Sequence, residues 1–362
     1  MSDTPDRPAY SAGKLPARAN LEHLKKEAKE RLQTMRSRAS SIRLSEAQLL
    51  VARSYGFPSW RKLKAHVDAL HNFGQQLINA LHAGDLDTMR GILDKHPDLV
   101  NAGMDLPRID RPSIDRPSIV RPSDTLGMRL IHLAIAEGRE DVLRLLIERG
   151  ADLNARNADG RLPLHDCFEL NHDDFAKLLL DAGAVPDVCA AAVYGMYEQL
   201  EQILEPDLAM ANDLTTGNSP LGWSVYGREA KSATILFLHG AIVELPPYDA
   251  YAWGPASAVG STVVTPILLE HGANPNWQDE AGNTPIHLAI ASRLVVDPAE
   301  FVQLLLRFGA DPTLRNREGR TPLDEAEALL HSGKNAETYF PARPIGPKKL
   351  ERTVEILRSR MT

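Results

Sequence analysis

One pattern recurs along most of this chain at a spacing of 33 residues. His132 and His165 stand near the starts of two copies and are 33 residues apart, and Gly150 and Gly183, which close the same two copies, have the same separation. Between these points each copy carries two short apolar segments with helical periodicity, such as Val142-Leu143-Leu145-Leu146-Ile147. A pair of short helices cannot bury its apolar face alone. Neighbouring copies must therefore stack to build one continuous core.

The copies share an opening and a closing motif. The opening is Gly-x-x-Pro-Leu-His or a variant of it, and the closing is Gly-Ala followed by a polar turn. Two further copies, residues 80–101 and 190–212, lack the opening motif but keep the helix pair. We count eight repeats in all, and the recognisable openings lie at residues 127–134, 159–165, 218–221, 282–289 and 319–323.

These motifs resemble the ankyrin repeat, with its signature T-P-L-H-x-A and its period of 33 residues. The resemblance implies an all-α solenoid of helix-turn-helix pairs with short β-hairpin fingers, in which the motif histidine hydrogen-bonds the adjacent finger. The local chemistry agrees. Proline in the first helical turn loses only an N–H that would be unpaired anyway, and Gly150 is expected to end its helix in a left-handed turn.

The pattern divides the chain into three parts. We predict a flexible N-terminus over residues 1–19, a basic three-helix segment over 20–72 and the ankyrin array over 73–362. The array is interrupted by a loop insertion at 104–124 and a C-terminal loop at 332–347. The insertion contains three near-identical Ile-x-Arg-Pro-Ser pentapeptides. We interpret it as a duplicated loop, with a recognition arm as the alternative, and its evenly spaced arginines are Arg111, Arg116 and Arg121.

The basic segment allows two interpretations. Residues 1–72 carry 14 Lys and Arg against 7 Asp and Glu, although the whole chain has a net charge of −7. We expect Ser45 and Gln48 to form a capping box on its second helix and Ser59 to cap the third. The segment resembles a short helical one found ahead of ankyrin repeats in some bacterial proteins, and it would cap the first repeat.

The alternative is a DNA-binding helix-turn-helix whose recognition helix would carry Arg61, Lys62 and Lys64. The register of apolar residues disfavours this alternative. Lys62 occupies a position at which that motif buries an apolar residue, and Leu63 is displaced from it by one position. A packed cap is therefore the favoured interpretation.

Composition excludes several classes of protein. The apolar share of 43% and the charged share of 25% are typical of a folded domain. No apolar run approaches the roughly 20 residues that a membrane-spanning helix needs, and the first 20 residues lack the apolar block of a secretory signal. With only Cys167 and Cys189, neither a disulfide framework nor a Cys-rich zinc site is encoded. We expect a cytoplasmic monomer without metal or cofactor.

A catalytic function is not indicated either. His165-Asp166-Cys167 holds the elements of a nucleophilic site, but sequence neighbours on one helix do not face each other. His132, His165 and His287 also share one repeat position, which favours a structural role. His172, Asp173 and Asp174 beside His165 lack the spacing of a zinc site. No Gly-rich phosphate loop, G-x-S-x-G elbow or H-E-x-x-H motif is present. We therefore predict that the chain is not an enzyme.

The remaining function is the binding of a protein partner. Eight of the twelve Trp and Tyr residues lie between Tyr194 and Trp277, and such residues dominate binding hot spots. By the resemblance, partners bind the concave face, and Trp223 and Tyr226 on a first helix would point outward there. Trp253 and Trp277 are expected to pack in the core. The candidate partner-binding residues are Trp223, Tyr226, Tyr194 and Tyr197, with a polar rim of finger-tip residues Asn157, Arg161, Asp279, Asn283, Arg317 and Arg320.

Three roles follow from partner binding. The first is a scaffold or regulator of a protein partner. The alternatives are a nucleic-acid-associated regulator that uses the N-terminal helices, and an inhibitory or regulatory subunit of an enzyme. Nothing in the residues names the partner, and export as an effector stays open.

Overall fold

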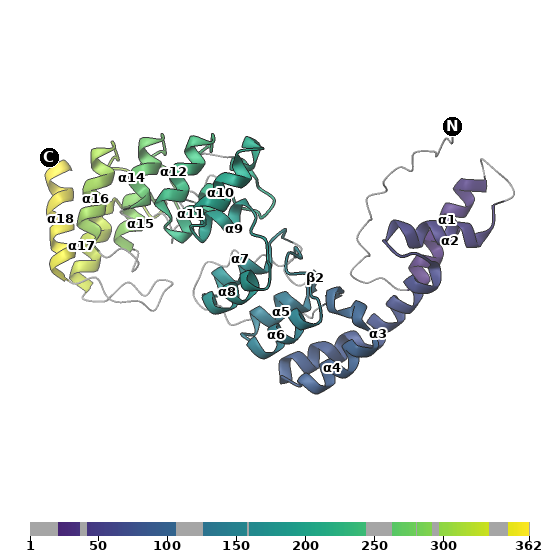
Figure 1. Cartoon of the computed structure of the whole chain (residues 1–362). Coiled ribbons are helices and arrows are strands. Elements are labelled where there is room, and N and C mark those ends of the chain that lie inside the picture. Colours follow the sequence, from purple (N-terminus) through teal and green to yellow (C-terminus); the bar gives the residue numbers. More distant parts are fainter. Residues whose placement is uncertain are drawn as a thin grey trace. The chain divides into compact units, whose positions relative to one another are not determined.

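The structure of the chain is a computed structural model (Figure 1) that describes residues 21–36, 42–105, 126–157, 159–243, 263–279, 281–291, 297–332 and 347–361. These residues form two compact units. Unit 1 takes the described residues up to 105 together with 126–157 and 169–184, and unit 2 takes 159–168 and 185–361. The expected flexible N-terminus, most of both predicted loops, and Tyr251 and Trp253 lie outside the described residues.

Unit 1 begins with three helices that share a small core of their own. They are α1 (Leu21–Arg36), α2 (Leu44–Ser54) and the first half of α3 (Trp60–Ala83), and the side chains that they bury together are Leu24, Ala28, Val51, Ala52, Leu63 and Val67.

The predicted caps of these helices have different outcomes. Ser59 caps α3 as predicted, because its Oγ accepts the N–H of Lys62 at 3.3 Å. The capping box predicted for Ser45 and Gln48 is wrong. Helix α2 begins two residues earlier than this cap requires, at Leu44, and its cap residue Arg43 makes no side-chain cap hydrogen bond. Ser45 therefore lies inside the helix.

Helix α3 continues without a break past residue 72, where we had expected the N-terminal segment to end. Its second half packs against α4 (Leu86–Lys95) and forms the first repeat, in which Leu77, Leu81, Met89 and Leu93 are buried. The N-terminal helices and the first repeat thus share one helix. Gly84, with a φ of 68°, ends it in the left-handed conformation.

The first finger is a short antiparallel hairpin. After the 3-10 turn η1 (Pro97–Asn101), strand β1 (Gly103–Asp105) pairs with β2 (Leu126–Arg129), in the register Gly103 to Arg129 and Met104 to Met128. Residues 106–125, which contain the three pentapeptides, connect the two strands. The insertion therefore falls within a finger, as the repeat spacing predicts.

The rest of unit 1 consists of α5 (Leu130–Ala136), α6 (Glu140–Glu148) and α8 (Asp173–Asp181). Helix α6 buries Val142, Leu143, Leu145 and Leu146, which is the apolar stripe predicted from the sequence. Gly150 has a φ of 76° and donates its N–H to the carbonyl of Ile147 at 3.0 Å. The predicted left-handed helix stop is thereby confirmed.

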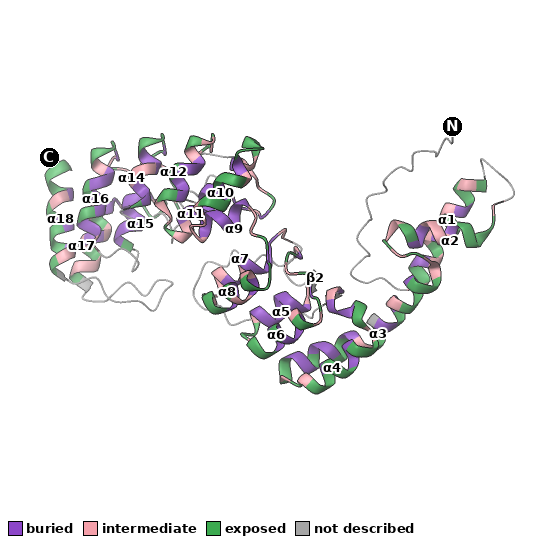
Figure 2. Cartoon of the chain, in the orientation of Figure 1, coloured by how far each residue is buried: buried purple, intermediate pink, exposed green. Residues whose placement is uncertain are grey.

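Unit 2 is a two-layered stack of helices (Figure 1). Its second helices form one layer: α10 (Tyr197–Leu204), α12 (Ala230–Leu238), α14 (Val264–Glu270), α16 (Pro298–Arg307) and α18 (Pro347–Met361). The first helices α9 (Val188–Val193), α11 (Pro220–Gly227), α15 (Pro285–Ala291) and α17 (Pro322–Ser332) form the other. Residues 163–168 of α7 (Pro163–Glu169) also belong to this unit. The 3-10 turn η2 (Leu208–Asn212) follows α10. Proline is the first residue of α7, α11, α15 and α17. The residues coloured as buried lie mainly on the facing sides of the helices (Figure 2).

Helices α9 and α11 approach each other unusually closely. Every residue of α9 is buried, and three successive alanines, Ala190, Ala191 and Ala192, give it a slim surface. On α11, a Cβ added to Gly227 would lie 3.2 Å from the Cα and carbonyl carbon of Val193 and still closer to the carbonyl oxygen. Small side chains on both helices therefore set their distance.

Adjacent repeats are also joined by asparagine clamps. In each clamp the side-chain amide donates to the carbonyl of the glycine that closes the next repeat, and its oxygen accepts the N–H two residues further on. Asn276 does this with Gly309 at 3.1 Å and Asp311 at 2.7 Å. Asn101 clamps Gly150 and Asp152, and Asn212 clamps Gly240 and Ile242. Each of these three clamps thus connects the glycine turn that follows a second helix to the preceding repeat.

We expect Asn276→Ala to lower the free energy of unfolding by about 1–2 kcal/mol, because it removes two hydrogen bonds and leaves their backbone partners unpaired. Urea denaturation followed by circular dichroism measures this effect. The exposed Asn79, whose amide oxygen accepts from Gln75 Nε2 at 2.9 Å, gives a matched control in which alanine costs less than about 0.5 kcal/mol. Equal losses in the two variants would contradict the clamp.

Candidate partner-binding site

The finger residues Asp279 and Asn283 hold their own turn together. Asp279 Oδ1 accepts the N–H groups of Ala281 at 2.9 Å and Asn283 at 2.8 Å, and its backbone N–H donates to the carbonyl of Asn283 at 3.1 Å. Asn283 Nδ2 donates to Asp279 Oδ2 at 3.2 Å. Both side chains are only partly exposed, so much of their hydrogen-bonding capacity is used within the finger.

The next finger repeats this design and joins the first. The buried Asn316 accepts the N–H of Arg320 and donates its amide to Asn283 Oδ1, at 3.1 Å in both cases. Arg317 donates its backbone N–H to the carbonyl of Ala281 at 2.8 Å, and its side chain is exposed. Arg320 lies beside Glu325 at 3.1 Å and also pairs with Glu318. The structure therefore brings Asp279, Asn283, Arg317 and Arg320 together, and the side chains of Arg317 and, at 42%, Arg320 are the more exposed of the four.

Asn157 and Arg161 occupy the corresponding positions of an earlier finger, and they lie in different units. Asn157 is half-buried in unit 1. Arg161 in unit 2 is buried, and its guanidinium lies 5.8 Å from the ring centroid of Trp223, as in a cation–π contact. The expectation that Arg161 forms part of an exposed rim is therefore wrong.

Trp223 does not face outward. Its side chain is 2% exposed, its indole N–H donates to Thr216 Oγ1 at 2.9 Å, and its ring centroid lies 4.9 Å from that of His165. The expectation that this ring belongs to a surface patch is wrong. The slim α9 carries Ala191 at the repeat position of Trp223, and the indole fills space that a larger neighbour would occupy.

Three half-buried rings lie over Trp223 and define what we call the ring cluster: Phe168 of α7, Tyr194 after α9 and Tyr226 of α11. Phe168 makes edge contacts with Tyr194 at 5.5 Å, with Tyr226 at 5.1 Å and with Trp223 at 6.5 Å. The Tyr194 hydroxyl donates to the carbonyl of Leu164 at 3.0 Å, which fixes its ring. The ring cluster is thus a preorganised aromatic surface at the ends of three consecutive first helices.

Sequence reasoning found Tyr194 and Tyr226 but missed Phe168. Phe168 lies before the stretch that is rich in Trp and Tyr, and it is a phenylalanine. The signal in the sequence is its place at the end of a first helix, which it shares with Tyr194 and Tyr226.

Tyr197 lies next to the ring cluster but has a different environment. Its hydroxyl donates to Glu229 Oε2 at 2.7 Å, and Lys231 Nζ lies 4.3 Å from its ring centroid. The hydrogen bond to Glu229, together with some burial, raises the pKa of Tyr197. This tyrosine stays protonated and presents a polar edge to the aromatic surface.

The basic residues of the N-terminal alternative lie at the start of α3. Arg61, Lys62 and Lys64 are all exposed, whereas Leu63 is buried in the small N-terminal core. Lys62 is thus exposed at a position where a helix-turn-helix motif needs a buried apolar residue, in agreement with the register expected from the sequence.

The motif histidines are held by structural hydrogen bonds. His132 Nε2 lies 2.9 Å from the carbonyl oxygen of Ala155, and His287 Nε2 lies 3.0 Å from that of Arg320, so both contact the next finger as the resemblance predicted. His165 differs at Nε2, which lies 3.2 Å from Asp187 Oδ1 instead of a backbone carbonyl, while its Nδ1 accepts the N–H of Leu162. His165 and Cys167 are both fully buried. No three His, Cys, Asp or Glu side chains are grouped as metal ligands within the described ranges.

His287 makes stability depend on pH. Burial lowers the pKa of His287 below its ordinary value of 6.5, and its Nδ1 already accepts the N–H of Thr284 at 3.1 Å. As pH falls through about 6.5, the unfolded chain binds a proton at this residue more readily than the native chain does. We therefore expect the free energy of unfolding to decrease on acidification from about pH 7.5 to about pH 5.5. The decrease should be smaller in His287→Gln. Denaturation at several pH values measures both slopes, and equal slopes would contradict this assignment.

Comparison with known proteins identifies the fold family. Residues 77–190 match the family described as ankyrin repeats (3 copies), and residues 268–326 match ankyrin repeats (many copies). The chain is therefore an ankyrin-repeat protein with an all-α solenoid fold, whose first finger is the β1–β2 hairpin. Ankyrin repeats are protein-interaction modules. No helix in the described part of the chain combines the length and apolar character needed to cross a bilayer.

Similar proteins match over short stretches. ADP-ribosylation factor GTPase-activating protein AGD4 of Arabidopsis thaliana is 45% identical over 62 residues, 17% of this chain and 8% of that protein. The NF-kappa-B inhibitor cactus of Drosophila yakuba is 48% identical over 56 residues, 15% of this chain and 12% of that protein. Rabankyrin-5 of Mus musculus is 28% identical over 165 residues, 41% of this chain and 14% of that protein. The matched parts are thus a small fraction of each relative.

Among solved structures, the ankyrin repeat domain of Bcl-3, titled a member of the IkappaB protein family, matches at 24% identity. The match covers 64% of this chain and 99% of that one, with a TM-score of 0.34.

Proposed function

We propose that this protein scaffolds or regulates a protein partner, which it binds through the ring cluster and the fingers at residues 279–283 and 316–320. The observation that carries the proposal is the ring cluster itself: Phe168, Tyr194 and Tyr226 lie half-buried at the ends of three consecutive first helices. Aromatic rings held in place before binding contribute contact area at a low entropic cost. The concave face of the array is the corresponding surface in the family.

The polar rim of this surface is smaller than the sequence suggested. Arg317 and Arg320 contribute exposed side chains, while Asp279 and Asn283 act mainly by holding the turn of one finger and its contact to the next. Tyr197, with Glu229 and Lys231, adds a polar edge next to the rings. We propose that the ring cluster forms the apolar centre of the interface and that these polar residues form its margin, which is the usual anatomy of a protein–protein interface.

The proposal assigns no reaction to the chain. One form of this regulation is to mask an enzyme or a transcription regulator. The stretch that matches the NF-kappa-B inhibitor cactus supports this form, because that protein is named as an inhibitor. A cytoplasmic monomer is the proposed state, supported by two buried thiols, Cys167 and Cys189. The nucleic-acid alternative would use Arg61, Lys62 and Lys64.

Capture of the tagged full-length chain from nuclease-treated host lysate, followed by mass spectrometry, tests the proposal. We expect a stoichiometric protein partner whose affinity falls by about 2 kcal/mol or more in Tyr226→Ala, a roughly 30-fold change in Kd. Phe308→Ala removes an exposed aromatic side chain from the end of α16 and serves as the matched control.

Circular dichroism of both variants separates loss of binding from loss of folding. A partner held equally by wild type and Tyr226→Ala would rule out the ring cluster as its site. Recovery of nucleic acid alone, and only without nuclease, would favour the N-terminal alternative.

A further inference from the structure

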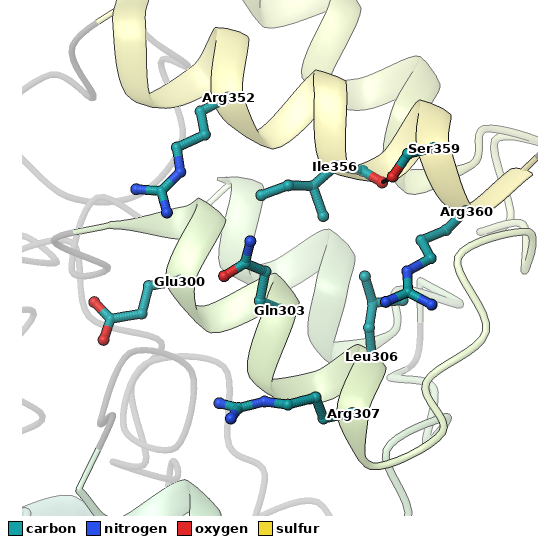
Figure 3. Close-up of a pocket in the computed structure, with 8 residues that line it drawn as sticks. All are labelled: Glu300, Gln303, Leu306, Arg307, Arg352, Ile356, Ser359 and Arg360. Atoms are coloured by element: carbon teal, nitrogen blue, oxygen red, sulfur yellow. Dashed lines mark hydrogen bonds between the residues drawn. The ribbon is translucent and has the colours of Figure 1, made fainter.

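A groove of about 530 Å³ lies between the second helices α16 and α18, far along the sequence from the ring cluster. Its apolar floor is formed by Leu306 of α16 and Ile356 of α18, both half-buried. Polar and charged side chains surround this floor (Figure 3), namely Glu300, Gln303, Arg307, Arg352, Ser359 and Arg360. The volume falls within the range of ligand-binding sites.

The groove carries an excess of positive charge. Arg307, Arg352 and Arg360 face a single acidic residue, Glu300, and none of the three arginines has a carboxylate within 4.0 Å among the residues that the structure describes. Arg358 on the same helix α18 is different, because it pairs with Glu327 at 2.7 Å. Arg358 is therefore already paired with a carboxylate, whereas the three arginines along the groove remain available to an anion.

The spacing of these arginines defines the shape of an occupant. Arg352, Ile356 and Arg360 follow one another at intervals of four residues, so they lie on one face of α18, with Ile356 between the two arginines (Figure 3). Eight residues of helix separate the two arginines by about 12 Å. An occupant that carries two negative groups about two helical turns apart, with an apolar group between them, matches this spacing.

We propose that this groove binds an acidic amphipathic helix of another protein. Carboxylates two turns apart on such a helix would pair with Arg352 and Arg360, and an apolar side chain between them would contact Leu306 and Ile356. Arginine binds carboxylates in a bidentate manner, and an amphipathic helix in a groove is a recurrent mode of peptide recognition. The site uses none of the residues of the ring cluster, so it does not depend on the function proposed above.

A synthetic peptide tests this inference with the full-length chain. The probe is a fluorescein-labelled, alanine-based helix of about 20 residues that carries two glutamates two turns apart and a leucine midway. The control peptide has glutamine in place of both glutamates. We expect fluorescence anisotropy to show binding of the glutamate peptide that weakens with added salt and at least a tenfold weaker affinity, about 1.4 kcal/mol, for the glutamine peptide.

The protein variants locate the site. The double variant Arg352→Gln with Arg360→Gln should weaken binding of the glutamate peptide about tenfold or more. Arg358→Gln removes one positive charge, half of the change in the double variant, from another face of α18 and should alter affinity by less than about twofold. All three arginines are exposed, and thermal unfolding checks that the variants stay folded.

Several results would overturn the proposal. They are no binding of the glutamate peptide at about 1 mM, equal binding of both peptides, or equal effects of Arg358→Gln and the double variant. If sodium pyrophosphate binds instead of the peptide, and the double variant loses it, the groove is a phosphate site and the helix proposal is wrong.

Discussion

Replacing Trp223 with alanine is expected to lower the free energy of unfolding by about 3–5 kcal/mol, the range for a large aromatic residue removed from a core. The indole is 2% exposed and contacts rings from both α7 and α11: His165, Phe168 and Tyr226. The variant leaves a cavity beneath the ring cluster and deprives Thr216 of its donor at 2.9 Å. A loss of this size is a large part of the stability of an ordinary domain.

Denaturant unfolding followed by far-ultraviolet circular dichroism measures this loss, and Trp223→Phe separates its two causes. Phenylalanine keeps most of the ring packing but cannot donate to Thr216, so we expect a loss of about 1–2 kcal/mol. Because repeat arrays can unfold in parts, tyrosine fluorescence should be followed in the same experiment. A loss below about 1 kcal/mol in Trp223→Ala would mean that the ring is on the surface after all.

The second large effect is expected at Gly227. Gly227→Val should destabilise the native state by about 3 kcal/mol, at the upper end of the range for overpacking. The added side chain would collide with the backbone of Val193, which, unlike the tip of a flexible side chain, cannot rotate away. The helices α9 and α11 would have to separate, and the contacts of Phe168 with Tyr194 and Tyr226 at the ends of these helices would loosen.

Glycine elsewhere on a helix supplies the control. Gly91 lies exposed in α4, and a Cβ built there meets no atom within 4 Å. Gly91→Ala should therefore stabilise the chain by up to about 1 kcal/mol through helix propensity alone, while Gly227→Ala should destabilise it. Thermal and denaturant unfolding of the two alanine variants give the comparison. Changes of the same sign in both would exclude close helix packing as the role of Gly227.

The fold was predictable from the sequence because the residues that determine it recur at a regular spacing. Proline at the first turn, the histidine contact to the next finger and the left-handed glycine at the end are local features, and each depends only on residues within one repeat or its neighbour. The structure has Pro163, Pro220 and Pro285 at helix starts and Gly150 in the left-handed conformation, as that chemistry requires.

The site was less predictable because it depends on where repeats deviate from one another. Trp223 occupies a position that usually faces outward, and only the alanines of α9 and the glycine at 227 make room to bury it. Asp279 and Asn283 look like rim residues by type, yet they bond their own turn. The basic groove combines α16 with α18 across residues 333–346, and periodicity alone does not give that register.

The asparagine clamps have a further consequence for how such a chain can change. Each clamp reaches only backbone atoms of the following repeat: a glycine carbonyl and an N–H two residues later, as with Asn212, Gly240 and Ile242. Because no side chain of the partner takes part, the joint does not depend on which residues the next repeat carries. Repeats of different sequence can therefore be exchanged, duplicated or deleted without matching mutations at these joints. Their exposed surfaces are thereby left to diversify.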